Sequence, residues 1–191
     1  MTDLTLTGHD QRAVAGMKTA VARNQAFAAA GGHDGASLFP ALGLLVVTCL
    51  DARVDPARIL DLDLGEALVI RNNGGRVTPQ LINDLAYVSQ LAETARPEGP
   101  PFEVAVIHHT QCGAARLADD AFRRRYAERI GANESTLRDY AILDPATTVI
   151  EDVHRLLRSD AISPRVTVSG HTYDVATGLL QTVIPAAARA A

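Results

Sequence analysis

The chain contains two cysteines, and each lies in a segment whose residue types suit metal binding. Cys49 ends an apolar run, and Cys112 closes the segment His109-Thr110-Gln111-Cys112. Zn²⁺ prefers thiolate and imidazole ligands in a tetrahedron, and a catalytic zinc site uses three protein ligands and leaves the fourth position to water. Cys49, His109 and Cys112 supply three such ligands. We therefore predict a catalytic site that holds one Zn²⁺ per chain.

Either of two adjacent histidines could supply the imidazole ligand of the metal. Side chains alternate across an extended segment, so only one of His108 and His109 is expected to face the metal. The spacing His-x-x-Cys favours His109, and we expect His108 to be packed or hydrogen-bonded at the end of its strand. The remaining histidines have no ligand spacing and are predicted to lie at the surface or in turns: His9, His33, His154 and His171.

The elements that must position these residues alternate between strand and helix. Continuously apolar runs are typical of buried parallel strands. They predict strands over Leu42–Cys49, Ala67–Ile70 and Glu103–His108, with further extended segments over Arg165–Ser169 and Leu179–Ile184. Helical periodicity, capping residues and prolines predict helices over Asp10–Ala29, Asp55–Leu60, Thr78–Arg96, Gly113–Ile130 and Pro145–Leu157.

This alternation predicts an α/β fold with a central, mostly parallel β-sheet flanked by helices. Ligands of such sheets bind beyond the carboxyl ends of the strands, where Cys49 and His109 are both placed. Glycines at 31, 32 and 35 separate the first helix from the rest. We therefore expect one domain over residues 1–191, made of an N-terminal helical arm (1–35) and a catalytic α/β core (36–191).

Composition excludes several classes of protein. The 191 residues carry a net charge of −4 and no long basic run, which argues against nucleic acid as a partner. The longest apolar stretch, Ala41–Val47, is far too short for a membrane span, and the first residues do not resemble a signal peptide. We predict a cytoplasmic protein, because a reducing compartment keeps cysteines available for metal.

Four motifs together resemble those of the β-class carbonic anhydrases. Cys49-Leu50-Asp51-Ala52-Arg53 is similar to the C-x-D-x-R signature of that family, and His109-Thr110-Gln111-Cys112-Gly113 to its H-x-x-C-G signature. Gly65-Glu66 with Arg71-Asn72 and Gly74 resembles the segment G-[DE]…R-N-x-G, and residues 173–179 resemble Y-D-V-x-T-G-x-L. The resemblance runs from about residue 42 to 184.

The resemblance implies a β-carbonic anhydrase fold and reversible hydration of carbon dioxide to bicarbonate by zinc-bound hydroxide. Cys49, His109 and Cys112 would hold the zinc, and Asp51 and Arg53 would form a catalytic dyad. Asp51 would accept a hydrogen bond from the nucleophile, and Arg53 would hold that carboxylate in a bidentate pair. The resemblance also implies a homodimer or tetramer in which the N-terminal helix embraces a neighbouring subunit.

Three alternative functions are compatible with parts of this pattern or are tested by it. The same zinc scaffold supports hydrolysis of carbonyl sulfide or carbon disulfide, and the ligands do not discriminate between these linear substrates. This chain also departs from many family members by having His108 and Gly75 at two motif positions. A non-catalytic zinc-binding protein would close the site with a fourth ligand, for which Asp51 is the candidate. A cysteine phosphatase is excluded because neither cysteine begins a C-x₅-R loop.

Overall fold

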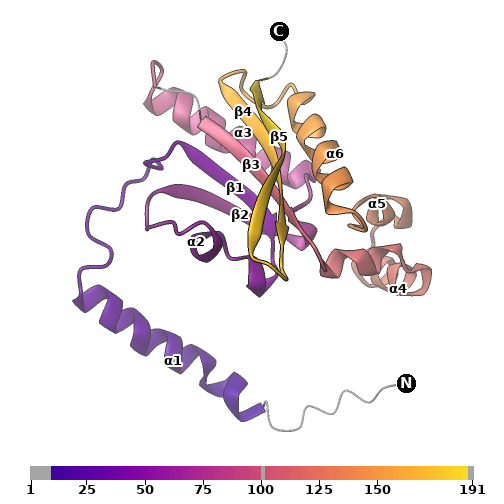
Figure 1. The fold of residues 1–191 in the computed structure, drawn as a ribbon, viewed down its shortest axis with the longest axis horizontal. Coiled ribbons are helices and arrows are strands. Elements are labelled where there is room, and N and C mark those ends of the chain that lie inside the picture. The colour runs from indigo at the N-terminus through magenta and orange to yellow at the C-terminus, as the bar shows by residue number, and fades with distance from the viewer. Residues whose placement is uncertain (1–9, 100–101, 189–191) are drawn as a thin grey trace. The chain divides into compact units, whose positions relative to one another are not determined.

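A computed structural model of the chain describes residues 10–99 and 102–188. The chain divides into two compact units, Met1–Ala36 and Ser37–Ala191. Helix α1 (Asp10–Ala29) lies in the first unit, and every other described helix and strand lies in the second (Figure 1). The predicted N-terminal helix is therefore confirmed. The division falls within one residue of the predicted arm and core, whose grouping into a single domain stays a prediction.

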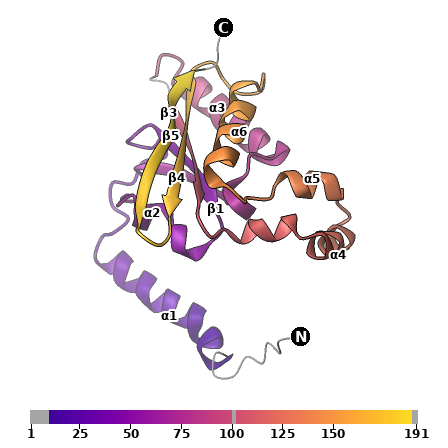
Figure 2. The same cartoon turned by 45° about the vertical axis from the view of Figure 1, so that its right-hand side comes forward.

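The second unit is built on a five-stranded sheet in the order β2-β1-β3-β4-β5. The strands are β1 (Leu44–Cys49), β2 (Ala67–Asn72), β3 (Phe102–His109), β4 (Val166–Asp174) and β5 (Leu179–Ala188). The first four run parallel, and β5 returns antiparallel to β4 as a twisted hairpin (Figure 2). The predicted α/β class with a mostly parallel sheet is confirmed.

Capping residues begin the helices where the sequence predicts them. Helix α2 (Pro56–Ile59) follows Asp55, α3 (Pro79–Ala95) follows Thr78, and α6 (Pro145–Leu157) follows Asp144. Each capping side chain accepts a hydrogen bond from a backbone amide of the first turn, and each helix has proline at its start. This arrangement satisfies amides that have no partner within the helix.

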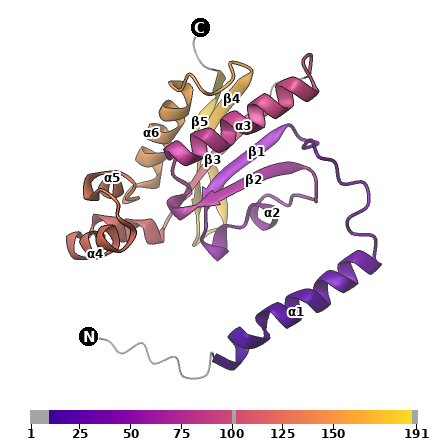
Figure 3. The same cartoon turned by 180° about the vertical axis from the view of Figure 1, so that it is seen from behind.

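The main core lies on the face of the sheet that α3 and α6 cover. Alternate residues of the central strands point to this face, among them Leu45 and Val47 of β1 and Val104 and Val106 of β3. They pack against Leu81 and Leu85 of α3 and against Val149, Val153 and Leu156 of α6. Figure 3 shows α3 lying across the strands on this side. Each fully buried aliphatic side chain contributes roughly 1.5–3 kcal/mol to folding, so the packing holds the strand ends rigidly in place.

The predicted single helix over Gly113–Ile130 is wrong. Residues Gly113–Ala118 form a 3-10 helix, η3, and α4 (Asp120–Ile130) begins separately after it. The break occurs because Asp119 has extended backbone angles and its side chain accepts a hydrogen bond from Phe122 N, which makes it the cap of a new helix. A further short helix, α5 (Glu134–Asp139), was not predicted.

Strand β4 is longer than the predicted segment Arg165–Ser169, because β5 pairs with it as far as Asp174.

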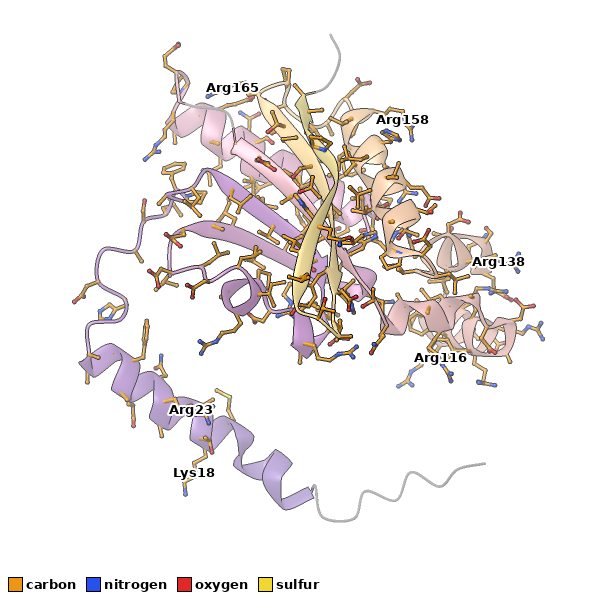
Figure 4. All side chains as sticks on the ribbon, viewed as in Figure 1. Lys18, Arg23, Arg116, Arg138, Arg158 and Arg165 are labelled. Carbon is orange, nitrogen blue, oxygen red and sulfur yellow. The ribbon has the colours of Figure 1, made fainter. Side chains whose placement is uncertain are left out.

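In Figure 4, the labelled arginines of the second unit lie on separate elements around the sheet: Arg116, Arg138, Arg158 and Arg165. No helix among the described residues has the length and apolarity needed to cross a bilayer.

Candidate metal centre

The three predicted ligands meet at one edge of the sheet. Cys49 is the last residue of β1 and His109 is the last residue of β3, and these strands are parallel neighbours. Cys112 follows β3 by three residues, and its Sγ lies 3.8 Å from the Sγ of Cys49. Two Zn–S bonds of about 2.3 Å at a tetrahedral angle span about this distance. The ligand atoms of all three residues lie within 4.8 Å of one another, so a single ion can reach them all.

The imidazole of His109 presents an unprotonated nitrogen to this cluster. Its Nδ1 lies 2.8 Å from the carbonyl oxygen of Thr110, and a carbonyl only accepts, so Nδ1 carries the proton. The Nε2 atom is buried and has no hydrogen-bond partner among the described residues. A buried lone pair without a donor is costly unless something binds it. The donor set therefore fits a metal ion.

The two thiols share one proton in the absence of a metal. A hydrogen bond from Cys112 lowers the pKa of Cys49 to about 4, assisted by the backbone amides of Asp51 and Gly74, although burial opposes the shift. The pKa of Cys112 is raised far above its usual value, first because its proton is held by the Cys49 thiolate and second because it is buried. An ion bound by both sulfurs would displace that remaining proton.

Asp51 lies beside the cluster and is held by Arg53 rather than pointing into it. Arg53 donates from Nε to Oδ1 at 3.0 Å and from Nη2 to Oδ2 at 2.6 Å, and its backbone amide donates to Oδ1 at 2.9 Å. These hydrogen bonds hold the pKa of Asp51 well below its usual range. Among the described residues the ligand cluster has three members, and Asp51 is not one of them. The arrangement therefore leaves one tetrahedral position open.

Gln111 is a residue of this site that the sequence analysis missed. Arg53 Nη2 donates to its carbonyl oxygen at 3.1 Å, and Arg53 Nη1 to its side-chain oxygen at 3.4 Å. Gln111 has a φ of 57°, in the left-handed region that non-glycine residues seldom adopt. Its position between His109 and Cys112 in the sequence could have indicated that Gln111 lies at the site.

Arg71 was also missed as a residue of the site, although it belongs to a quoted motif. It donates from Nε to the carbonyl oxygen of Cys49 at 2.9 Å and from Nη2 to that of Asp51 at 2.6 Å, and it pairs with Asp55 at 3.0 Å. Arg71 thereby ties β2 to the backbone that carries the first ligand and the dyad.

His108 turns to the opposite face of the sheet, as the alternation of side chains predicts. It is fully buried, with Nδ1 2.8 Å from Thr148 Oγ1 and Nε2 3.3 Å from both the Gly75 carbonyl and Asp152 Oδ2. Of the other histidines, His33 and His154 are exposed as predicted, and His9 lies outside the described residues.

The surface-or-turn prediction is only partly correct for His171, which is partly exposed but belongs to a strand. It lies within β4, where its Nε2 contacts Ser169 Oγ at 2.8 Å and its Nδ1 contacts Thr182 Oγ1 at 3.1 Å. Burial lowers its pKa, and only the nearby Glu103 acts in the other direction. The predicted strand ended at Ser169, which left His171 outside it.

Apolar side chains surround the two cysteines. The buried cluster contains Val54, Ala114 and Ile142, with Ile59, Tyr173 and Val175 packed against it. Such a wall excludes water and strengthens electrostatic interactions at the site. It also suits a small apolar substrate.

Comparison with known proteins agrees with this geometry. A family model described as "Carbonic anhydrase" matches residues 44–141. "Beta-carbonic anhydrase 1" of Mycobacterium tuberculosis is 35% identical over 150 residues, which cover 76% of this chain and 85% of that protein. The chain belongs to the β-carbonic anhydrase family. It is thus an enzyme of the carbonic anhydrase class.

Solved structures of family members share the fold. The carbonic anhydrase of Streptococcus mutans matches with a TM-score of 0.72 and 31% identity, covering 87% of this chain and 96% of that one. A more distant relative is the "Carbon disulfide hydrolase" of Saccharolobus solfataricus, which is 24% identical over 161 residues, or 72% of this chain and 76% of that protein. The family scaffold is therefore found with at least two named activities.

Proposed function

We propose that this β-carbonic anhydrase is a zinc enzyme that catalyses the reversible hydration of carbon dioxide to bicarbonate and a proton. The observation that carries the proposal is an open cluster of three soft donors beside a carboxylate that an arginine holds in place. A catalytic zinc site has the same composition: three protein ligands and one free position. The name of the M. tuberculosis relative supports the choice of carbon dioxide.

Cys49 Sγ, His109 Nε2 and Cys112 Sγ would hold the ion. Zinc, when bound, supplies a Lewis acid that makes water nucleophilic near neutral pH. Asp51 accepts a hydrogen bond from the attacking water and so directs an oxygen lone pair at the carbon of the substrate. Arg53 keeps the Asp51 carboxylate ionised and in one orientation through two parallel hydrogen bonds. The apolar side chains around the cysteines exclude competing water.

The same pairing argues against a closed, non-catalytic zinc site. A fourth protein ligand would come from Asp51, but both of its carboxylate oxygens already accept hydrogen bonds from Arg53. Moving Asp51 onto a metal would break a bidentate ion pair. The open position is therefore the stable arrangement for this dyad.

A second candidate function is hydrolysis of carbon disulfide or carbonyl sulfide. The observation that favours it is the match to a carbon disulfide hydrolase over 72% of this chain. These substrates are linear and apolar, and the same nucleophile attacks their carbon atom. The wall of apolar side chains around the cysteines suits them as well as it suits carbon dioxide.

The deciding experiment compares the three substrates on one preparation of zinc-loaded protein. Stopped-flow hydration of carbon dioxide is measured beside release of hydrogen sulfide from carbonyl sulfide and carbon disulfide. We expect kcat/KM to be highest for carbon dioxide. A higher value for a sulfur compound would establish the second candidate, and zinc-loaded protein inert toward all three would overturn both.

We also propose that the enzyme acts in the cytoplasm as a homodimer or tetramer. Both cysteines are free thiols, the state that a reducing compartment maintains. The described side chains of α1 from residue 16 onward are exposed, including the large apolar Met17 and Phe27. An exposed apolar face on a helix suits contact with a second subunit.

A further inference from the structure

A fully buried ion pair lies beneath the candidate metal centre. Asp152 of α6 and Arg76, which follows β2, have side chains with 0% exposure, and Arg76 Nε lies 2.8 Å from Asp152 Oδ2. Asp152 Oδ2 also accepts a hydrogen bond from the backbone amide of Val77 at 3.1 Å. Asp152 Oδ1 accepts one from Arg155 at 2.7 Å. The carboxylate thus joins α6 to the segment that follows β2.

Stability alone does not account for this pair. Taking two charges out of water costs about as much as their attraction returns, and apolar side chains of similar volume commonly fill such sites without loss of stability. A buried pair of this kind instead selects one backbone arrangement, because each partner accepts few alternatives. A role for the buried pair is therefore expected in the backbone segment that it holds.

That segment is a tight turn pressed against the strand that carries Cys49. Gly74 and Gly75 have φ values of 79° and 68°. A Cβ atom on Gly75 would lie 2.8 Å from the carbonyl carbon of Thr48 and 3.0 Å from the backbone nitrogen of Cys49. Two consecutive glycines do not hold such a turn by themselves, since glycine adopts many other backbone angles. Asp152 anchors the turn at its far end through Val77.

The turn delivers a hydrogen bond to a candidate metal ligand. The backbone amide of Gly74 acts on the Cys49 thiol as a hydrogen-bond donor that lowers its pKa, and the turn that carries this amide lies directly against the backbone of Thr48 and Cys49. An N–H group directed at a thiolate withdraws charge from the sulfur, so the sulfur donates less to a bound ion. Two thiolates cancel the charge of Zn²⁺, and hydrogen bonds that reduce their donation keep the ion able to activate water.

We propose that Asp152 is a positioning residue of the metal centre: it fixes the Gly74–Val77 turn so that the Gly74 amide donates to the Cys49 sulfur. This inference rests on the proposed metal site. According to this proposal, a residue of α6, on the opposite face of the sheet, controls how strongly the Cys49 sulfur on β1 donates electrons to a bound ion. Asp152 itself touches neither the ligands nor the substrate.

The first test is made on metal-free protein, so that it does not depend on the proposed function. Amide hydrogen exchange at Gly74 and Val77 is compared between the wild type and Asp152→Asn, which keeps the size of the side chain but removes its charge. We expect protection at Val77 to fall about tenfold or more when the charge-assisted bond is lost. Unchanged protection at both amides would overturn the inference.

The second test uses cobalt(II) as a spectroscopic probe of the sulfur ligands. Loss of the Gly74 hydrogen bond makes the thiolate more electron-rich, so the sulfur-to-cobalt charge-transfer band of Asp152→Asn should move to longer wavelength. A band identical to that of the wild type would overturn the inference. A wild type without any cobalt band would instead overturn the proposed metal site, while the exchange result still decides whether Asp152 holds the turn.

The matched control is Asp144→Ala, on the same helix. Asp144 is exposed and caps α6 by accepting a hydrogen bond from Ala146 N, so its loss weakens the helix without touching the buried pair. It should lower the urea midpoint but leave the exchange pattern at Gly74 and Val77 and the cobalt band unchanged; the same spectral shift in this control would overturn the inference. If Asp152→Asn does not fold, the double variant Arg76→Met with Asp152→Leu keeps an apolar filling and is measured in the same way, with the same two outcomes.

Discussion

Two thiols and one imidazole define the chemistry of this chain at the scale of single residues. In the absence of an ion, Cys49 is ionised near neutral pH because its pKa is about 4, whereas Cys112 keeps its proton. Burial alone would lower the pKa of His109, but the neighbouring thiolate and the Thr110 carbonyl raise it. The site therefore competes for cations against at least one bound proton.

This competition predicts how zinc affinity depends on pH. Because one proton must leave Cys112 for each ion bound, the apparent affinity should rise about tenfold per pH unit between roughly pH 6 and 8. Protonation of His109 would steepen the dependence at the acidic end. Competition with a chromophoric chelator at several pH values measures the slope. An affinity independent of pH would show that Cys112 is not a ligand.

Asp51 is predicted to serve the reaction and not the binding of metal. Asp51→Ala should keep one zinc ion per chain while the rate of carbon dioxide hydration falls about 100-fold, the range typical of a positioned proton acceptor. The matched control is Asp63→Ala, which removes an exposed carboxylate farther along the chain. Metal analysis and stopped-flow hydration are measured on each protein. Loss of zinc in Asp51→Ala would make Asp51 a ligand, and an undiminished rate would remove it from the mechanism.

Among the elements, the turn after β2 is where close packing is most demanding. Gly75 combines a φ of 68° with backbone contacts that leave no room for a methyl group. Glycine therefore suits this position in the chain. The carbonyl of Gly75 lies beside the ring of His108, so the two departures from the family pattern are neighbours in space.

Substitution of Gly75 by alanine should therefore lower the free energy of unfolding by more than the unfavourable backbone angle alone would. The control is Gly178→Ala, with a φ of 73° but no atom nearer than 3.8 Å to an added Cβ. We expect Gly178→Ala to lower the free energy of unfolding by about 1 kcal/mol and Gly75→Ala by about 2 kcal/mol or more. Urea denaturation provides both values. Equal losses of unfolding free energy in the two variants would show that the turn after β2 accommodates the added methyl group without strain.

On the scale of the whole molecule, helix α1 of the first unit builds no core from the side chains that the structure describes. Its described side chains from Gly16 to Ala29 are exposed, with Met17 at 72% and Val21 at 45%. In proteins, most of the stability of a helix comes from packing of its apolar face against other elements. Contact with a second subunit would bury this face.

The double variant Met17→Glu with Val21→Glu should therefore shift the protein toward a smaller assembly. Charges on the apolar face would have to be desolvated in the interface, whereas Lys18→Glu reverses a charge at an exposed polar position and should have little effect. Light scattering after size-exclusion chromatography gives the mass of each protein. An unchanged assembly in the double variant would exclude this face of α1 from the interface.

The sequence by itself determined the ligand types, their order and the elements that carry them. Apolar runs located β1 and β3, and the pairs Asp55-Pro56 and Thr78-Pro79 located the starts of α2 and α3, because periodicity and capping are local properties. The tertiary structure alone decided that Arg53 reaches Gln111, that His171 lies in a strand, and that Asp119 begins a separate helix. It also brought Asp152 to Arg76 and Val77 across 75 or more residues of chain. Such contacts depend on how a helix packs against a sheet, and no local pattern of residue types encodes which buried charges will meet.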